Sequence, residues 1–169
     1  MNLDTLISSN AVLINHEIKS KKRALELLAE QLAVEATRVN QQPSTEDQPG
    51  TINPLEIFQL LTDREKLGST SLGHGVALPH TRTNLTEHAV GAFLKLDEGI
   101  DFDSPDQQST DLIFALMVPE HYTDEHLKIL AYLATLFSEE DFCNVLRNST
   151  TTEDIYKHLI NWQLTSQAS

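Results

Sequence analysis

A chain of 169 residues, 40% of them apolar, is long enough to bury the core of a single domain. Its formal net charge of −13 argues against nucleic acid as a partner, because phosphate backbones are bound by patches of Lys and Arg. The single cysteine, Cys143, excludes a disulfide within the chain and suits a reducing compartment. Residues 1–10 lack the pattern of a signal peptide, and no apolar run approaches the roughly 20 residues that cross a bilayer. We therefore predict a cytoplasmic protein without membrane insertion.

Two amphipathic helices are predicted in the N-terminal half. The first covers residues 20–36, where apolar side chains recur every fourth position and Ser20 is the candidate N-cap. Residues near 40–52 are polar and rich in turn formers, which predicts an inserted, mobile loop. The second helix follows, with Asn53 as N-cap and Pro54 at its first position, and it ends at the glycine of Leu67-Gly68.

After the second helix the hydrophobic period changes to that of strands. Residues 89–96 alternate between apolar and small or polar side chains. Residues 111–118 form a continuous apolar run closed by Pro119, which is typical of a strand buried on both faces. Shorter strands are expected at 12–15 and 76–78.

Three further helices are predicted in the C-terminal half. They begin at Thr123 or Asp124, at Ser138, and at Thr151 or Thr152, and the tail after residue 164 is expected to fray. Strands interleaved with helices, some strands close enough to pair as a hairpin, predict a mixed α/β sandwich. We expect one such domain over residues 1–169.

The segment 67–82 carries the strongest functional signal. Three glycines within eight residues permit positive φ angles and leave backbone N–H groups uncovered. Pro79 then stiffens the approach to His80, and the guanidinium groups of Arg64 and Arg82 flank the segment on either side. A flexible loop that ends in a rigid histidine between two arginines predicts a site that handles phosphate.

His80 is the candidate nucleophile, since a histidine ring nitrogen can carry a phosphoryl group covalently. Arg64 can offer a bidentate fork to the phosphoryl oxygens. Uncovered N–H groups and hydroxyls are expected to form a phosphate cradle. The cradle residues are Ser69, Thr70, Gly73 and Gly75. The alternative is that a histidine after a proline is purely structural.

His126 is a second candidate, placed in the first turn of the third helix. There the N–H groups and the helix dipole favour anions, and its ring can reach a phosphoryl oxygen or His80. The alternative is a solvated residue, and a spacing of 46 residues does not prove that the two rings meet.

Other chemistries lack their motifs. The chain lacks the closely spaced pairs of histidines or cysteines that predict a metal site. It also contains neither a G-x-S-x-G elbow nor a nucleotide-binding glycine fingerprint. The basic cluster Lys19, Lys21, Lys22 and Arg23 is read as a solvated helix start, with docking as the alternative.

These residues resemble the active-site signature of type-2 enzyme IIA domains, the fructose–mannitol class of the bacterial phosphoenolpyruvate-dependent phosphotransferase system. The likeness is carried by REKLGST at 64–70, GHGVALPH at 73–80, DLIFALMVP at 111–119 and HLKIL at 126–130. Within that class, SKKRALELL at 20–28 resembles the nitrogen-regulatory branch. The resemblance covers most of the chain, and it implies a mixed, roughly five-stranded sheet flanked by helices.

The resemblance also implies a function. His80 would be the phosphorylated residue, His126 its active-site partner and Arg64 the stabiliser of the phosphoryl group, with no cofactor. An HPr-like protein would be the donor, and potassium-transport components or kinases would be the regulated targets. Two alternatives stay open: a sugar-specific enzyme IIA that passes phosphate to a IIB protein, and a binding module that is not phosphorylated. His74, where relatives often carry Asn, and a loop at 41–51 that is longer than usual depart from the pattern.

Overall fold

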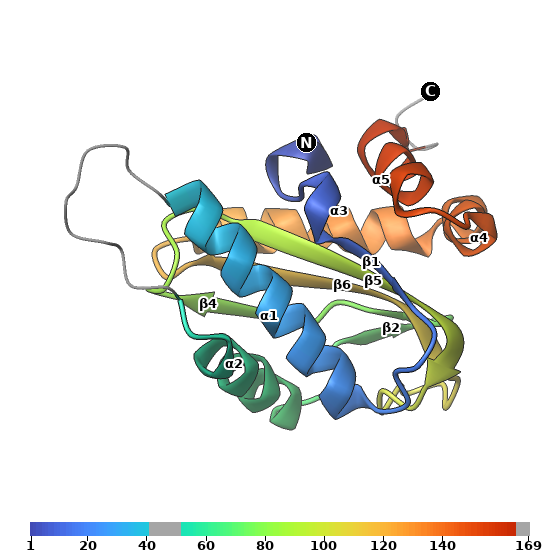
Figure 1. Cartoon of the computed structure of the whole chain (residues 1–169), viewed down its shortest axis with the longest axis horizontal. Coiled ribbons are helices and arrows are strands. Elements are labelled where there is room, and N and C mark those ends of the chain that lie inside the picture. Colours follow the sequence, from blue (N-terminus) through green and yellow to red (C-terminus); the bar gives the residue numbers. More distant parts are fainter. Residues whose placement is uncertain (41–51, 165–169) are drawn as a thin grey trace.

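The computed structural model describes residues 1–40 and 52–164, within which six strands form one mixed sheet (Figure 1). The strands are β1 (Val12–Asn15), β2 (Ser71–Gly73), β3 (Val76–Ala77), β4 (His80–Thr83), β5 (Val90–Ile100) and β6 (Thr110–Pro119). Their order is β1-β5-β6-β3-β2, and β4 pairs with β6 off this path. The pairs β1–β5, β3–β6 and β4–β6 are parallel, whereas β5–β6 and β2–β3 are antiparallel.

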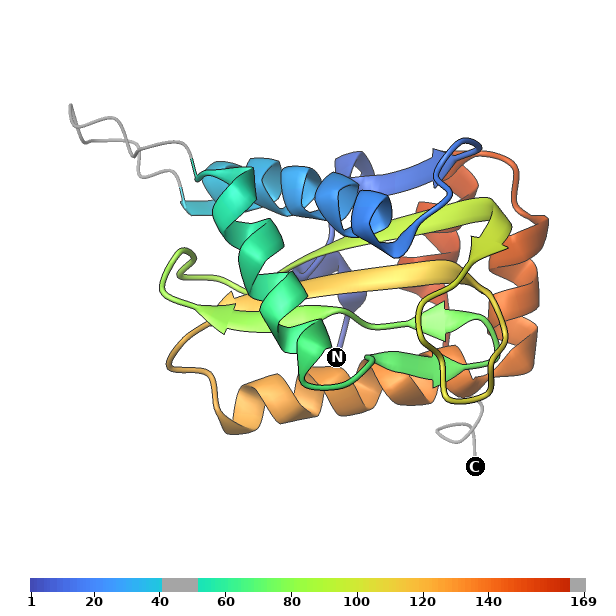
Figure 2. The same ribbon diagram turned by 90° about the horizontal axis from the view of Figure 1, so that it is seen from below.

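Five α-helices are found in the described part of the chain. They are α1 (Lys21–Asn40), α2 (Pro54–Lys66), α3 (Asp124–Ser138), α4 (Glu140–Asn148) and α5 (Thr152–Asn161), preceded by two short 3-10 helices at Leu3–Thr5 and Ser9–Ala11. Helices α1 and α2 lie on one face of the sheet and α3 lies on the other, so the sheet is sandwiched between helical layers (Figures 1 and 2). The predicted α/β sandwich is confirmed.

The core is centred on the antiparallel pair of β5 and β6. Phe93 of β5 lies opposite Phe114 of β6 in the register, and both side chains are fully buried. On the α3 side of the sheet, Phe137 stacks on Phe93 at 6.1 Å between ring centroids and contacts Phe142 of α4 at 5.2 Å. Nearly every residue of β6 is buried, which confirms the prediction of a strand covered on both faces.

Six strands are present where the resemblance implied about five, because the chain from residue 76 to 83 forms two strands along the same side of β6. β3 pairs with Leu112 and Ile113, and β4 pairs with the stretch from Leu116 to Pro119. Between them lies Pro79, which has no N–H to donate and interrupts the ladder, although its carbonyl still accepts from the N–H of Leu116. Neither β2 nor β4 was predicted from the residue pattern.

Three of the predicted helix starts are confirmed by cap hydrogen bonds. The side chains of Ser20, Asn53 and Thr151 each accept a backbone N–H of the following turn. Helix α3 also begins at Asp124 as predicted, although the Thr123 side chain makes no capping hydrogen bond. Ser138, however, does not start a helix: it is the last residue of α3, where its hydroxyl donates back to the carbonyl of Thr135 at 2.6 Å. Glu139, with an extended backbone, is the N-cap residue of α4. A serine hydroxyl can bond either way, and the sequence alone does not decide which.

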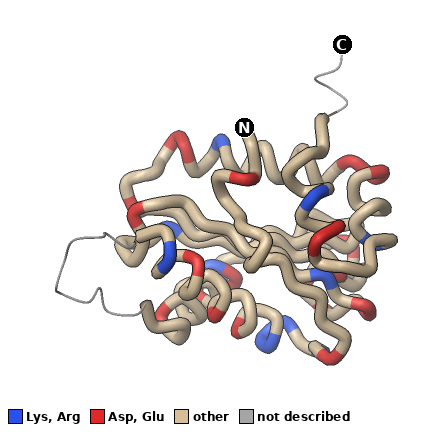
Figure 3. The backbone as a smooth tube through the Cα atoms, turned by 45° about the horizontal axis from the view of Figure 1, so that its top comes forward, with Lys and Arg blue, Asp and Glu red and all other residues tan. Residues whose placement is uncertain are grey.

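Acidic residues occupy the first turns of α2, α3, α4 and α5, where they complement the positive end of the helix dipole. Figure 3 shows acidic positions on most helices. Within residues 1–40 and 52–164, no helix is both long and apolar enough to pass through a bilayer. The predictions of a mobile loop near 40–52 and of a frayed tail after 164 fall almost wholly on residues 41–51 and 165–169, which lie outside the described residues.

Gly91 of β5 provides a test of the core packing. A Cβ added there would approach Cε1 of the Phe114 ring to 2.7 Å, well inside van der Waals contact. Gly91→Ala is therefore expected to lower the free energy of unfolding by about 1–3 kcal/mol, measured by urea denaturation. Phe114→Leu in the Gly91→Ala background should cost less than the sum of the two single changes, because it makes room for the new methyl group. Strict additivity would contradict this packing.

Candidate functional site

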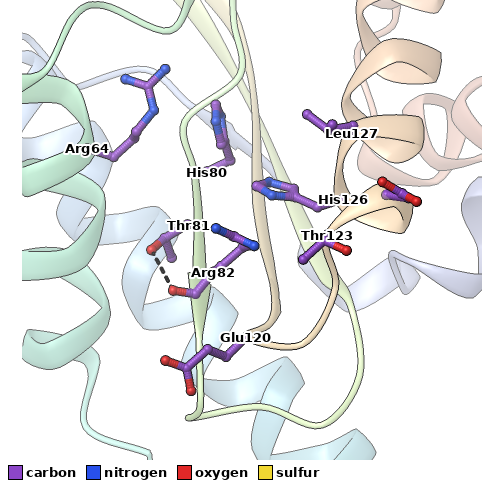
Figure 4. Close-up of a pocket in the computed structure, with 9 residues that line it drawn as sticks. Arg64, His80, Thr81, Arg82, Glu120, Thr123, His126 and Leu127 are labelled. Atoms are coloured by element: carbon purple, nitrogen blue, oxygen red, sulfur yellow. Dashed lines mark hydrogen bonds between the residues drawn. The ribbon is translucent and has the colours of Figure 1, made fainter.

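A pocket of about 690 Å³ opens where the end of α2, the strand β4 and the start of α3 converge (Figure 4). The pocket is lined by Arg64, His80, Thr81, Arg82, Glu120, Thr123, Asp124, His126 and Leu127. Three separate parts of the chain therefore contribute to it, and the three functional residues predicted from sequence, Arg64, His80 and His126, all lie in its wall.

His80, the first residue of β4, is half-buried and held in one orientation by the backbone. Its Nδ1 lies 2.7 Å from the carbonyl oxygen of Leu78. Because a carbonyl only accepts hydrogen bonds, Nδ1 must carry the proton. In the neutral ring the lone pair is then on Nε2, so Nε2 is the nucleophilic nitrogen.

His126 approaches His80 from α3 on the opposite side of the pocket from Arg64 (Figure 4). The two imidazole centroids are 5.4 Å apart, with ring planes at 66° to each other. Within the described part of the chain, Nε2 of His126 is buried and has no hydrogen-bond partner. An unpaired buried ring nitrogen is costly, and it is suited to bind a group that enters the pocket. The 46-residue gap in sequence is thus closed by the fold.

Two guanidinium groups are the cationic side chains of the pocket wall, which also carries the carboxylates of Glu120 and Asp124. Arg64 sits in the last turn of α2 and donates from Nη1 to the carbonyl of Gly68 at 2.9 Å. Arg82 follows His80 by two residues on β4 and donates from Nη1 to the carbonyl of Tyr122 at 3.3 Å. Both side chains retain further N–H donors, since a guanidinium carries five.

Burial keeps both imidazoles neutral. Desolvation is the main cause that lowers the pKa of His80 below its ordinary value, with the Leu78 carbonyl raising it and the Arg64 charge lowering it further. Desolvation, followed by the charges of His80 and Arg82, lowers the pKa of His126 to about 4. Near pH 7, His80 is therefore unprotonated at Nε2, and His126 is uncharged.

The depressed pKa values make the stability of the fold depend on pH. Between pH 6.5 and about 4 the unfolded chain binds a proton at His126 that the folded chain does not, so the free energy of unfolding falls as the pH is lowered through this window. Above pH 6.5 the residue is neutral in both states and contributes no slope. His126→Gln is expected to flatten this part of the stability profile, measured by urea unfolding at pH 7, 6, 5 and 4.5. An equally steep loss in the variant would contradict the assigned pKa.

The residues of the predicted phosphate cradle lie outside the wall of this pocket. Ser69, Thr70, Gly73 and Gly75 are not among the residues that line the pocket. The glycines do adopt positive φ, but they form the tip of the β2–β3 hairpin, where Asp111 and Leu112 donate to the Gly75 carbonyl. On β6, Leu112 pairs next to this tip and Leu116 pairs with His80. These two residues are four positions apart, which corresponds to about 13 Å along the strand.

The polar groups of the hairpin are engaged elsewhere. The N–H of His74 donates to Asp106 at 2.9 Å, and its carbonyl accepts from Arg147 at 2.8 Å. Hydrogen bonds from Ser104, His74 and Gln108 lower the pKa of Asp106 to about 2. His74, for all its position in the signature, therefore belongs to a structural turn at a distance from the pocket.

Besides Arg82, which was noted only as a flanking charge, five pocket residues were not among the predicted site residues: Thr81, Glu120, Thr123, Asp124 and Leu127. Thr81 and Glu120 directly follow His80 and Pro119, whereas Thr123 and Asp124 begin the helix that carries His126. Their proximity in sequence to recognised residues was the only available signal.

The basic cluster is largely structural, since Lys19, Lys21 and Arg23 pair with acidic side chains. Among the described residues, no group of three His, Cys, Asp or Glu side chains gathers to hold a metal ion.

The sequence matches a known family over most of its length. The pattern described as "Phosphoenolpyruvate-dependent sugar phosphotransferase system, EIIA 2" matches residues 5–162, and the chain belongs to this family. The resemblance found in the sequence motifs is thereby confirmed.

The similar proteins indicate the branch of the family. A "Nitrogen regulatory protein" of Bradyrhizobium diazoefficiens is 38% identical over 159 residues, which span 94% of this chain and 95% of the relative. One of the same name from Escherichia coli is 35% identical, spanning 92% and 91%. The crystal structure of nitrogen regulatory protein IIA-Ntr from Neisseria meningitidis superimposes with a TM-score of 0.79 at 34% identity, covering 91% of this chain and 96% of that one.

Proposed function

We propose that this chain is a regulatory phosphocarrier that accepts a phosphoryl group on Nε2 of His80 from an HPr-like protein and controls target proteins through its phosphorylation state. The observation that carries this function is His80 itself. Its Nδ1 proton is bound by a backbone carbonyl, its Nε2 is the nucleophilic nitrogen, and it lies between Arg64 and His126. Membership of the enzyme IIA family supports phosphoryl transfer as the chemistry.

The transfer step needs only groups that the pocket and the donor supply. The lone pair on Nε2 attacks the phosphorus of a phosphohistidine on the donor, and a new N–P bond forms as the donor's N–P bond breaks. The bond electrons return to the donor ring. The positive charge that develops on the His80 imidazole is stabilised at Nδ1–H by the carbonyl of Leu78, 2.7 Å away.

The phosphoryl oxygens would be bound by the other residues of the pocket. The guanidinium groups of Arg64 and Arg82 oppose the added negative charge, and His126 can donate from the buried Nε2 that has no partner among the described residues. Only a few such contacts suit a carrier, because a phosphoryl group that is bound too tightly would not be passed on.

A regulatory role is favoured by the relatives and by the charge of the chain. The curated relatives that share 35–38% of their residues with this chain are named nitrogen regulatory proteins. Phosphorylation adds about two negative charges to a chain whose formal charge is already −13. A partner bound to the unmodified pocket face would then be repelled. Potassium-transport components or regulatory kinases, which the motif resemblance suggests, are the targets we propose.

A sugar-specific enzyme IIA is the second candidate. The observation in its favour is a "PTS system fructose-specific EIIA component" of Haloferax volcanii that is 27% identical over 161 residues. The two functions share the first phosphoryl transfer and differ in what receives the phosphoryl group afterwards.

The test is incubation of the full chain with phosphoenolpyruvate and the two general phosphotransferase proteins. We expect one phosphoryl group per chain, which persists when a fructose-type IIB protein is added. Rapid loss of the label to IIB would instead support the sugar-specific function. A wild-type chain that takes up no phosphate would contradict phosphocarrier function altogether and leave a binding module.

A further inference from the structure

Glu65 is a buried carboxylate directly beside the pocket that the transfer step does not use. Its side chain is 5% exposed, and it accepts three hydrogen bonds or ion-pair contacts. Oε2 lies 3.2 Å from the backbone nitrogen of Thr70 and 2.9 Å from Nζ of Lys21, and Oε1 accepts the hydroxyl proton of Thr70. Its two hydrogen bonds bind Thr70 in the turn that follows α2, and its ion pair reaches Lys21 at the start of α1.

The ion pair with Lys21 ties this turn to two other parts of the molecule. Lys21 begins α1, and its Nζ also lies 3.2 Å from Asp103 and 4.7 Å from the centroid of the Phe102 ring. A buried ion pair contributes little to stability on balance, because desolvation offsets the attraction between the charges. The main effect of this ion pair is therefore to fix the position of Glu65 between α1 and the segment after β5.

A short chain of hydrogen bonds connects Glu65 to His80. The carbonyl of Thr70 accepts the N–H of Leu78 at 3.1 Å, which extends the β2–β3 pairing by one residue. The carbonyl of the same Leu78 accepts the Nδ1 proton of His80 at 2.7 Å. A shift of Thr70 would therefore move the peptide groups on either side of Leu78 and, with them, the hydrogen bond to the His80 ring.

The same turn also supports Arg64. Gly68 donates its N–H to the carbonyl of Glu65 at 3.1 Å, and its own carbonyl accepts Nη1 of Arg64 at 2.9 Å. Residues 64, 65, 68 and 70 therefore form one hydrogen-bonded unit. A displacement of this unit would move the guanidinium and loosen the bond to His80 together.

We propose that Glu65, together with Thr70, is a positioning residue for phosphoryl transfer. The buried carboxylate fixes the turn after α2, whose Gly68 carbonyl orients Arg64 and whose Thr70 carbonyl holds Leu78. The carbonyl of Leu78 in turn selects the Nδ1–H tautomer of His80. This role rests on the phosphocarrier function proposed above. Without it, the Leu78 carbonyl is no longer held against Nδ1. The imidazole then also populates the tautomer with its proton on Nε2, which has no lone pair there to attack phosphorus.

The test compares Thr70→Val, which removes the hydroxyl donor at nearly constant shape, with Thr70→Ser, which keeps the hydroxyl. A third variant, Glu65→Gln, removes the charge of the carboxylate. Asp103→Asn is the matched control, because it removes another carboxylate from Lys21 without touching Thr70. Two quantities are measured on folded protein: the tautomer of His80, by nitrogen-15 NMR of the imidazole, and the steady-state rate of phosphoryl transfer from an HPr-like donor.

We expect wild type, Thr70→Ser and Asp103→Asn to hold the proton on Nδ1. Thr70→Val and Glu65→Gln should show a mixture of tautomers and a kcat lowered by about tenfold, with KM within about twofold of wild type. An unchanged tautomer in both of these folded variants would overturn the positioning role, whether or not the rate falls. The tautomer is read on unphosphorylated protein, so it decides this role even if wild type fails to be phosphorylated, a result that would contradict the proposed function instead.

Discussion

Replacing His80 by glutamine is expected to abolish phosphorylation of the chain. An amide nitrogen is not a nucleophile, whereas its N–H can still donate to the Leu78 carbonyl that now holds Nδ1. The side chain is only half-buried, so the fold should tolerate the change. The measurement is incorporation of phosphate from phosphoenolpyruvate through the general phosphotransferase proteins, with folding checked by circular dichroism.

His88→Gln is the matched control, since it makes the same chemical change at an exposed histidine that does not line the pocket. It should be labelled like wild type. A His80→Gln chain that is still labelled to the wild-type level would show that another residue is the acceptor.

Arg64→Gln is expected to slow phosphoryl transfer to His80 by about 100-fold. The guanidinium lies in the wall of the pocket and opposes the charge of the phosphoryl oxygens, and loss of one such donor in a preorganised site commonly costs this much. The effect should fall on kcat, because the charge acts on the group in transfer. It is measured by rapid-quench kinetics at saturating donor.

Arg82→Gln gives the comparison within the same pocket. Arg82 is exposed, and the contact found for its guanidinium among the described residues is a long one of 3.3 Å to the Tyr122 carbonyl, so we expect a smaller loss of about tenfold. Equal rates for Arg64→Gln and wild type would contradict a role for Arg64 in binding the phosphoryl group.

Local rules predicted the elements whose signals lie within a few residues. Asn53-Pro54 began α2 as expected, and the apolar run before Pro119 formed the buried central strand β6. In each case the signal lies within the segment itself: a capping residue for α2 and a run of apolar residues for β6. Such features need no knowledge of the rest of the fold.

Tertiary context decided what local rules missed. His80 to Thr83 carries polar side chains after a proline, and it forms a strand only because β6 offers it a parallel partner. The positive φ angles of the glycine-rich tip were predicted correctly, and they were the reason for expecting a phosphate cradle there. Its direction was not predictable, however, because it depends on pairing with β6 at Leu112, about 13 Å from the level of His80.

The approach of the two candidate histidines also depends on tertiary packing. His80 and His126 were selected as chemically suitable residues, and only the packing of α3 against the sheet brings their rings to 5.4 Å. Glu65 gave no signal of its own beyond being next to Arg64, since its role depends on Lys21 and Thr70 lying on either side of it.

The most direct test of phosphoryl transfer at this site is phosphorus-31 and nitrogen-15 NMR of the phosphorylated, full-length chain. The hydrogen bond from Nδ1 to Leu78 predicts a single phosphohistidine in which phosphorus is coupled to Nε2 of His80, with the Nδ1 proton retained. Coupling to Nδ1, or a phosphoryl group on any other residue, would contradict it.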